Sequence, residues 1–319
     1  MPILDMSLEQ LKNYQGSNPK PSDFEEFWDE SLAELDEIEP RVELKAFDCH
    51  STVADCFEMT FTSTKGARIY AKLACPKNLD KKAPAVIFFH GLSGSSRDWT
   101  SVIPYAAEGM VVAAMDCRGQ GGFSEDVGGV AGTAFTTPFV RGVDGEPEGL
   151  YYRDVYLDCA MLARIVMGLD YVDAERVGVA GGSQGGGLSV ACAALVPEIK
   201  RCAPLYPYLS DYQRVWDMDL DKGAYEGIRY YLRHFDPTHQ NVDGFFEKLG
   251  YIDIQYLAPR IRAEVLMFTG LIDTTCPPST QFAAYNKITS KKNVVVYPDF
   301  GHEDLPHAQE TIFGFMRGL

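Results

Sequence analysis

A single serine, Ser183, is surrounded by glycines in the stretch GGSQGGG, residues 181–187. Gly181, Ser183 and Gly185 match the G-x-S-x-G pattern, in which the serine occupies a sharp turn between a strand and a helix. Glycines at these two positions keep side chains from colliding across the turn, which lifts the hydroxyl above the end of the sheet. Because an apolar, strand-like run precedes the serine and a helical run follows it, we predict that Ser183 is a nucleophile. The alternative is a turn that serves packing alone.

A serine hydroxyl is a weak nucleophile, so the chemistry requires a base and an acid that orients the base. In folds that carry this turn, the chain order is serine, acid, histidine. We predict that His302, in the turn after the apolar run NVVVYPDF, is the base; His307 also lies downstream of that run, and we expect it within the last helix. Asp273 ends the run AEVLMFTGLID and is the predicted acid, with a turn or helix-capping role as the alternative. Two rival carboxylates adjoin His302 too closely in sequence for the usual geometry: Asp299 and Asp304.

The tetrahedral intermediate of acyl transfer needs backbone N–H donors for its oxyanion. We expect one donor from Gln184, directly after the nucleophile, and the other from Leu92 in the loop HGLSG, which follows the run APAVIFF. Since both donors are main-chain groups, the side chain of Leu92 need not be polar. His90, at the start of the same loop, is expected to be structural.

The runs that carry these residues define the fold class. Short continuous apolar runs closed by turn residues are typical of strands buried on both faces of a parallel sheet. Five such runs are clear and the sixth is weaker; they are residues 83–91, 109–119, 176–182, 263–270 and 293–300, then 200–209. Two alternating runs, 56–63 and 67–76, predict an antiparallel lead-in. Helical patterns separate the strands, so we predict an α/β-hydrolase fold, a mostly parallel sheet with helices on both faces and inserted loops.

We expect one domain over residues 1–319, with a helical extension over about residues 1–40. Two capping boxes, Ser7 with Gln10 and Ser22 with Glu25, each fit the start of an amphipathic segment there. Two stretches interrupt the alternation of strands and helices: a glycine-rich loop insertion at 122–150 and a helical insertion at about 211–257. Long insertions of this kind usually act as a lid or an interface.

The charge and composition of the chain limit the kinds of molecule that it is expected to bind. The chain has 319 residues, a formal net charge of −16 at pH 7 and a sequence pI of about 4.8, and no block rich in Lys and Arg. Nucleic acids and anionic membranes both need cationic patches, so neither is expected as a partner. No apolar stretch is long enough to span a bilayer and no signal peptide is evident, so we expect a cytoplasmic location. Several of the eight cysteines lie in apolar runs without metal-ligand spacing, so we expect reduced core residues, no metal and no cofactor.

Three signatures occur together in the chain: RGQG at 118–121, GGSQGGG at 181–187 and HE at 302–303. With them, the sequence resembles carbohydrate esterase family 7, the acetyl xylan esterases and cephalosporin C deacetylases, over nearly its whole length. The resemblance implies a serine esterase with Ser183 as nucleophile, Asp273 as acid, His302 as base and Gln184 as oxyanion donor. The second oxyanion amide in that family belongs to a tyrosine; this sequence has Leu92 there, and a backbone donor survives the change.

The resemblance also implies the substrate and the assembly. The expected reaction removes acetyl groups from small acetylated sugars such as xylo-oligosaccharides, with cephalosporin C as a further candidate. The family's homohexamer leads us to expect a homo-oligomer, with the 122–150 loop supporting subunit contact. Alternatives are another short-chain carboxylesterase, a peptidase of the prolyl oligopeptidase kind, and a non-catalytic hydrolase-fold module. We expect Arg118 and Gln120 to hold neighbouring loops by hydrogen bonds rather than to touch substrate.

Overall fold

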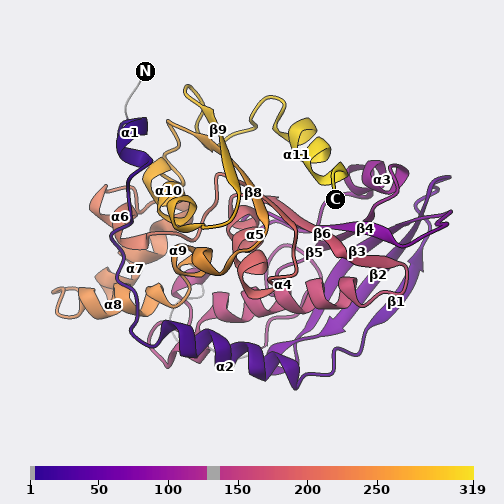
Figure 1. Ribbon diagram of the computed structural model, residues 1–319. Helices are drawn as coiled ribbons and strands as arrows, with labels where there is room; N and C mark the ends of the chain where they lie inside the picture. Colours follow the sequence, from indigo (N-terminus) through magenta and orange to yellow (C-terminus); the bar gives the residue numbers. More distant parts are fainter. Residues whose placement is uncertain (1–3, 128–136) are drawn as a thin grey trace.

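The structure, a computed structural model, describes residues 4–127 and 137–319. Within these residues the chain forms a nine-stranded sheet in the order β1-β2-β3-β5-β4-β6-β7-β8-β9 (Figure 1). The strands are β1 Glu43–Phe47, β2 Ala54–Thr62, β3 Arg68–Pro76, β4 Ala83–Phe89, β5 Val111–Met115, β6 Val172–Gly182, β7 Arg201–Leu205, β8 Glu264–Gly270 and β9 Lys292–Tyr297. Strands β4 to β9 are parallel, whereas β1, β2 and β3 pair antiparallel with their neighbours. The predicted α/β-hydrolase fold is confirmed.

Each face of the sheet is covered by helices, as the strand composition requires. In β4, Ala85, Ile87 and Phe89 pack into the core on one face, while Val86 and Phe88 pack on the other. Because successive side chains of a strand alternate between faces, a strand covered on both sides reads as a continuous apolar run. The first face holds α2 (Phe24–Asp36), α4 (Tyr151–Met167) and α5 (Gln184–Leu195), and the second holds α3 (Trp99–Ala107) and α11 (Ala308–Arg317).

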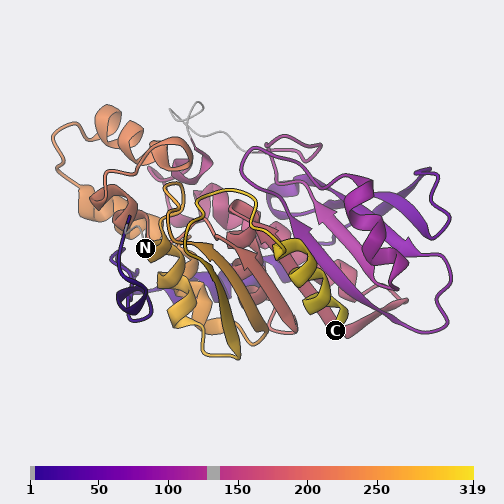
Figure 2. The ribbon, with the colours of Figure 1, turned by 90° about the horizontal axis from the view of Figure 1, so that it is seen from above.

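The 211–257 stretch is helical, with α6 (Tyr212–Asp217), α7 (Glu226–Phe235), α8 (Val242–Gly250) and the short α9 (Ile254–Leu257). Figure 2 shows α6 to α8 at one end of the molecule and the antiparallel strands β1 to β3 at the other. Part of the 122–150 loop, residues 128–136, lies outside the described residues. Its later part contains two 3₁₀ turns, Pro138–Val140 and Pro147–Gly149, that lead into α4.

The N-terminal segment begins with α1 (Leu8–Leu11), and the capping box of Ser7 with Gln10 is confirmed. The box of Ser22 with Glu25 was wrong. Helix α2 starts at Phe24 after Asp23, which makes no side-chain cap, and the Glu25 carboxylate instead accepts hydrogen bonds from Lys20 and Arg260, 2.8 and 2.9 Å away.

The buried Asp211 ties the same segment to the start of α6. Its carboxylate accepts hydrogen bonds from the Tyr14 hydroxyl at 2.8 Å and from the amides of Ser17 and Asn18 at 2.9 and 2.8 Å. Helix α10 (Pro278–Lys287) completes this side of the molecule, with the buried Phe282 packing in one cluster with Leu11 of α1.

Candidate active site

Ser183 occupies the turn between β6 and α5 in a strained conformation. Its φ of 57° and ψ of −120° lie in a region that side-chain-bearing residues rarely adopt, and such strain is typical of functional turns. The glycines explain how the turn closes. A Cβ on Gly181 would lie 2.6 Å from the carbonyl oxygens of Phe89 and Gly185, and a Cβ on Gly185 would lie 2.1 Å from the same Phe89 oxygen. The turn therefore brings α5 against the end of β4 at a distance that only glycine allows.

Three side chains from separate loops form one hydrogen-bonded chain at the carboxyl end of the sheet. The Oγ atom of Ser183 lies 2.9 Å from Nε2 of His302, and Nδ1 of His302 lies 2.9 Å from Oδ2 of Asp273. An ionised carboxylate only accepts hydrogen bonds, so Nδ1 carries the proton and Nε2 faces the hydroxyl as an acceptor. This is the tautomer that can remove the hydroxyl proton.

Asp273, in the turn after β8, is held by donors other than the histidine. Its side chain is fully buried, and its Oδ1 atom accepts hydrogen bonds from the amides of Thr275 and Cys276, both at 2.8 Å. The Gln281 carboxamide on α10 approaches Oδ2 at 3.4 Å and also donates to the Cys276 carbonyl oxygen at 2.6 Å. These contacts fix the carboxylate so that Oδ2 points at the imidazole.

The alternative acids and bases do not join this chain. Asp299 and Asp304 are both exposed, and the exposed His307 pairs with Glu310 at 3.1 Å. His307 also precedes the last helix rather than lying within it, because it adopts a left-handed conformation (φ 63°) that ends the turn before α11.

The two expected oxyanion donors lie on adjoining turns. The amide of Gln184 opens α5, where the first N–H groups of a helix have no partner within the helix. Leu92 follows β4 in a turn that an N–H···O bond from Gly94 to Gly91 closes at 3.0 Å. Within residues 4–127 and 137–319, neither the Leu92 nor the Gln184 amide has a protein hydrogen-bond acceptor.

Side chains of the RGQG stretch brace both turns. Gln120 accepts a hydrogen bond from the amide of Ser93 at 2.9 Å and donates one to the side-chain oxygen of Gln184 at 2.8 Å. The same Gln184 oxygen accepts from the Tyr152 hydroxyl at 2.6 Å. Gln120 thus bridges the loop of Leu92 and the first turn of α5, in line with its expected loop-holding role.

Arg118 is buried and likewise braces the fold. Its guanidinium donates to both carboxylate oxygens of Asp158 on α4, at 2.7 and 2.5 Å, and to the Thr64 hydroxyl at 2.8 Å. His90 is structural as expected: Nδ1 pairs with the Gly91 carbonyl at 2.7 Å and Nε2 accepts from the Cys117 amide at 2.9 Å. Burial lowers the pKa of His90, which keeps this imidazole neutral beside the oxyanion loop.

Three site features were not anticipated from the sequence. The Tyr206 ring lies 4.6 Å from the His302 ring, centroid to centroid, and burial raises the pKa of its hydroxyl to about 12. The buried Cys276 thiol lies next to the Ser183 hydroxyl, and burial raises its pKa well above the ordinary value. Gln281 holds Asp273. No sequence pattern marks the role of any of the three. Tyr206 and Cys276 reach the site through turns whose course depends on the folded sheet, and Gln281 reaches it from helix α10.

The described part of the chain contains no group of three or more His, Cys, Asp or Glu side chains placed to hold a metal ion. No helix among the described residues is long and apolar enough to cross a membrane.

A strained serine turn, an imidazole and a buried carboxylate at the carboxyl end of an α/β-hydrolase sheet define a site of the serine-hydrolase type. Comparison with known proteins narrows the class. The family model for acetyl xylan esterase matches residues 1–319. The chain therefore belongs to the acetyl xylan esterase family, whose members are carboxylic ester hydrolases.

Individual relatives agree with this assignment. Acetyl xylan esterase 1 from Thermoanaerobacterium sp. JW/SL YS485 superposes with a TM-score of 0.97 at 49% identity, covering 98% of this chain and 99% of that one. Acetyl xylan esterase from Paenibacillus sp. R4 gives a TM-score of 0.93 at 32% identity, with coverage of 98% and 99%. Acetyl esterase Axe7A from Xylanibacter ruminicola is 28% identical over 302 residues, which are 92% of this chain. The chain spans 65% of the length of that relative.

Proposed function

We propose that this protein is a serine esterase that removes acetyl groups from small acetylated sugars such as xylo-oligosaccharides. The observation that carries the proposal is the continuous hydrogen-bonded chain from Ser183 through His302 to the buried Asp273, with 2.9 Å at both links. The names of the relatives, which are acetyl and acetyl xylan esterases, support the acetyl group and the sugar. Cephalosporin C, an acetyl ester of similar size, is the second substrate to test.

The geometry supports a two-stage mechanism. Nε2 of His302 accepts the proton of Ser183 as the oxygen attacks the acetyl carbonyl carbon. The oxyanion then takes hydrogen bonds from the Gln184 and Leu92 amides, and each such donor contributes about 10²–10³-fold in rate. His302 returns the proton to the departing sugar alcohol, which leaves an acetyl group on Ser183. Water, activated by the same imidazole, releases acetate and restores the hydroxyl.

Asp273 stabilises the positive charge that His302 acquires in each stage. Because the carboxylate is fully buried while the imidazole is 21% exposed, its field acts on the ring with little screening by water. The Tyr206 ring contacts the imidazole at a tilt of 53°, and this contact restricts rotation of the imidazole, so Nε2 stays directed at the nucleophile.

The test compares initial rates on p-nitrophenyl acetate, butyrate and octanoate, with Ser183→Ala as the control. We expect a steep preference for acetate and loss of that activity in the variant. Acetate release from acetylated xylo-oligosaccharides then tests the sugar. Equal or faster turnover of octanoate would refute the acetyl preference, and an unimpaired Ser183→Ala enzyme would refute the mechanism.

The assembly of the protein and its location in the cell can each be tested directly. We propose a homo-oligomer, with a homohexamer as the specific state; Phe123, 78% exposed at the start of the 122–150 loop, supports a contact there. Size-exclusion chromatography with light scattering measures the mass. We propose a cytoplasmic location, supported by eight cysteines that are all free thiols in the structure. Fractionation of the source cells tests it.

A further inference from the structure

Two cysteines at the end of the antiparallel strands lie unusually close together. Cys49 follows β1 and Cys56 lies in β2, and their sulfur atoms are 2.6 Å apart. A disulfide bond is about 2.05 Å long, so about half an ångström separates this pair from bonding distance. We propose that Cys49 and Cys56 form an oxidation site that closes to an intramolecular disulfide by exchange with a low-molecular-weight disulfide such as oxidised glutathione.

The backbone holds the two residues in this position. Strands β1 and β2 pair with Phe47 opposite Cys56, which places Cys49 just beyond the last paired residue. The turn between them is tied internally: the Ser51 hydroxyl accepts from the amides of Val53 and Ala54 at 3.2 and 3.0 Å. Closing the bond therefore requires a small side-chain movement rather than a rearrangement of the turn.

Access and neighbours favour this pair over other pairings. Cys49 is partly exposed, whereas Cys56 and the six other cysteines are buried. Cys75 is the nearest rival because it lies on β3, which pairs with β2. Its side chain packs in the core on the opposite face of the sheet from Cys56, since Cys56 joins the cluster that contains α3 and α11. An incoming disulfide thus meets Cys49 first, and Cys56 is the partner within reach.

The reaction balances as two exchanges. The Cys49 thiolate attacks one sulfur of the small disulfide, and one small thiolate leaves. Cys56 then gives its proton to water and attacks the Cys49 sulfur of the mixed disulfide, which releases the second small thiolate. Two protein thiols are oxidised and one small disulfide is reduced to two thiols. The pKa of Cys56 is raised to about 12, mainly by burial and next by its contact with the Cys49 thiol. Because the thiolate is the attacking form, the second exchange accelerates as pH rises.

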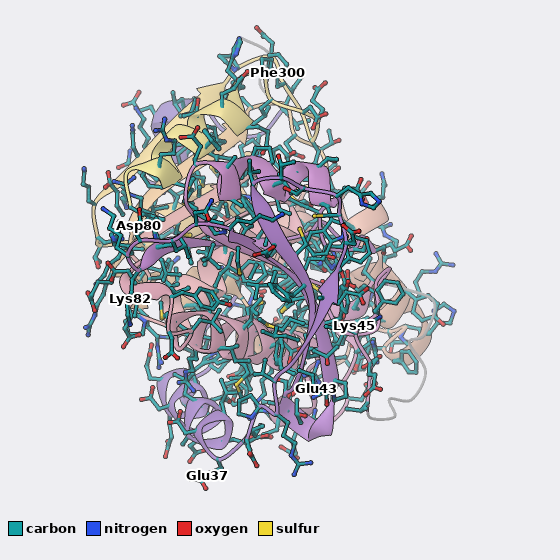
Figure 3. The ribbon with its side chains drawn as sticks, turned by 90° about the vertical axis from the view of Figure 1, so that its right-hand side faces the viewer. Glu37, Glu43, Lys45, Asp80, Lys82 and Phe300 are labelled. Atoms are coloured by element: carbon teal, nitrogen blue, oxygen red, sulfur yellow. The ribbon has the colours of Figure 1, made fainter. Side chains whose placement is uncertain are left out.

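The disulfide joins the end of the edge strand β1 covalently to its neighbour β2. Strand β1 is exposed along its whole length and, among the described strands, hydrogen-bonds only to β2. Figure 3 looks onto this side, where Glu43 and Lys45 mark β1 at the front. The Phe47 ring stacks on Trp99 of α3 with centroids 5.1 Å apart, so the end of β1 also covers α3. A covalent link at residue 49 keeps that end of β1 on the sheet.

The test begins with the purified full chain and its Cys49→Ser and Cys75→Ser variants, each incubated with oxidised or reduced glutathione. After denaturation and alkylation, intact mass spectrometry counts free thiols. We expect two thiols lost in the wild type and in Cys75→Ser, and none lost to an internal bond in Cys49→Ser. Cleavage before aspartate separates the two cysteines, because Asp55 lies between them, and yields a linked pair of peptides.

The rate of disulfide formation and the thermal stability of the oxidised protein complete the test. The closing rate should rise with pH, and the oxidised wild type should unfold on the order of a few degrees higher than the reduced protein, a shift absent from Cys49→Ser. A mixed disulfide that persists on Cys49 while Cys56 remains alkylatable would overturn the proposal. Retention of all eight thiols, or linkage through Cys75, would overturn it equally.

Discussion

Replacing Asp273 by asparagine tests the catalytic chain most sharply, because the structure determines how the new carboxamide must sit. In the wild type, Oδ1 accepts from the Thr275 and Cys276 amides at 2.8 Å, and Oδ2 faces Nδ1 of His302. An asparagine oxygen will keep the two backbone donors, so its NH₂ group will face the imidazole. Nδ1 must then accept, and the proton moves to Nε2, where it blocks transfer from Ser183.

The expected loss in kcat follows from the free-energy cost of the opposite orientation of the asparagine carboxamide. Turning the carboxamide round leaves two buried amides facing an NH₂ group, at about 1–3 kcal/mol each. Near the middle of that range, the productive orientation is populated to about one part in 10³. Loss of the carboxylate charge opposite the imidazolium adds to this, so we expect kcat to fall about 10⁴-fold, or about 5 kcal/mol of barrier.

The assay is the initial rate on p-nitrophenyl acetate at saturating substrate, with thermal unfolding to show that the variant is folded. Asp304→Asn is the matched control, since this carboxylate is exposed and close to His302 in sequence; we expect its kcat to stay within about threefold, as for other surface charges. A folded Asp273→Asn enzyme that keeps more than about a tenth of wild-type kcat would refute the assigned orientation and the role of the acid.

Three further predictions concern groups that support the fold and the site. Gly185→Ala places a Cβ 2.1 Å from the carbonyl oxygen at the end of β4, so urea unfolding should show a loss of stability of about 2 kcal/mol or more. Gly314→Ala on α11 is the control: it has open space around it and should be neutral or stabilising. Asp253, at the start of α9, is buried and accepts a hydrogen bond from the Asp211 amide at 2.8 Å. Burial raises the pKa of Asp253 from 3.8 to about 7, so its contribution to stability is present below pH 3.8 and is lost as pH rises to about 7. Urea unfolding across that window should show a decline in the free energy of unfolding, about 4 kcal/mol in all, that Asp253→Asn lacks. Arg118→Met leaves the buried Asp158 unpaired and should lower the free energy of unfolding by about 3–5 kcal/mol in the same assay. Adding Asp158→Leu should recover part of that stability, and an equal loss in the single and double variants would contradict this account.

The central strands of the sheet were predictable because a strand buried on both faces has a continuous run of apolar residues. Strands β4, β5 and β8 lie within the apolar runs expected for them, since both of their faces meet helices. Strand β1, by contrast, was not predicted. Its residues ELKAF are all exposed, and they form a strand only because β2 offers a free edge. An exposed edge strand carries little hydrophobic signal, and its pairing is visible only after its neighbour has folded.

The residues of the catalytic chain could be proposed from chain order, because this fold brings the turns after β6, β8 and β9 to one edge of the sheet. The residues that support them could not. Gln281 reaches Asp273 only because α10 folds back over the turn after β8, and glutamines in helices are common and carry no pattern. Side-chain contacts between loops depend on distances of a few ångströms, which no periodicity of the sequence encodes.

The side chains that bridge the two turns of the oxyanion donors are neutral, and electrostatics explains why this is favourable. Gln120, Gln184 and Tyr152 fix the two turns through uncharged hydrogen bonds, and His90 beside them is kept neutral by burial. A cation here would stabilise the oxyanion but would also oppose the imidazolium that forms on His302 at the same moment. Neutral amides act on the oxyanion alone, so the buried carboxylate of Asp273 can stabilise the imidazolium without competition. In the proposed mechanism, this separation of the two tasks over two sets of turns lets one imidazole both take and return the proton.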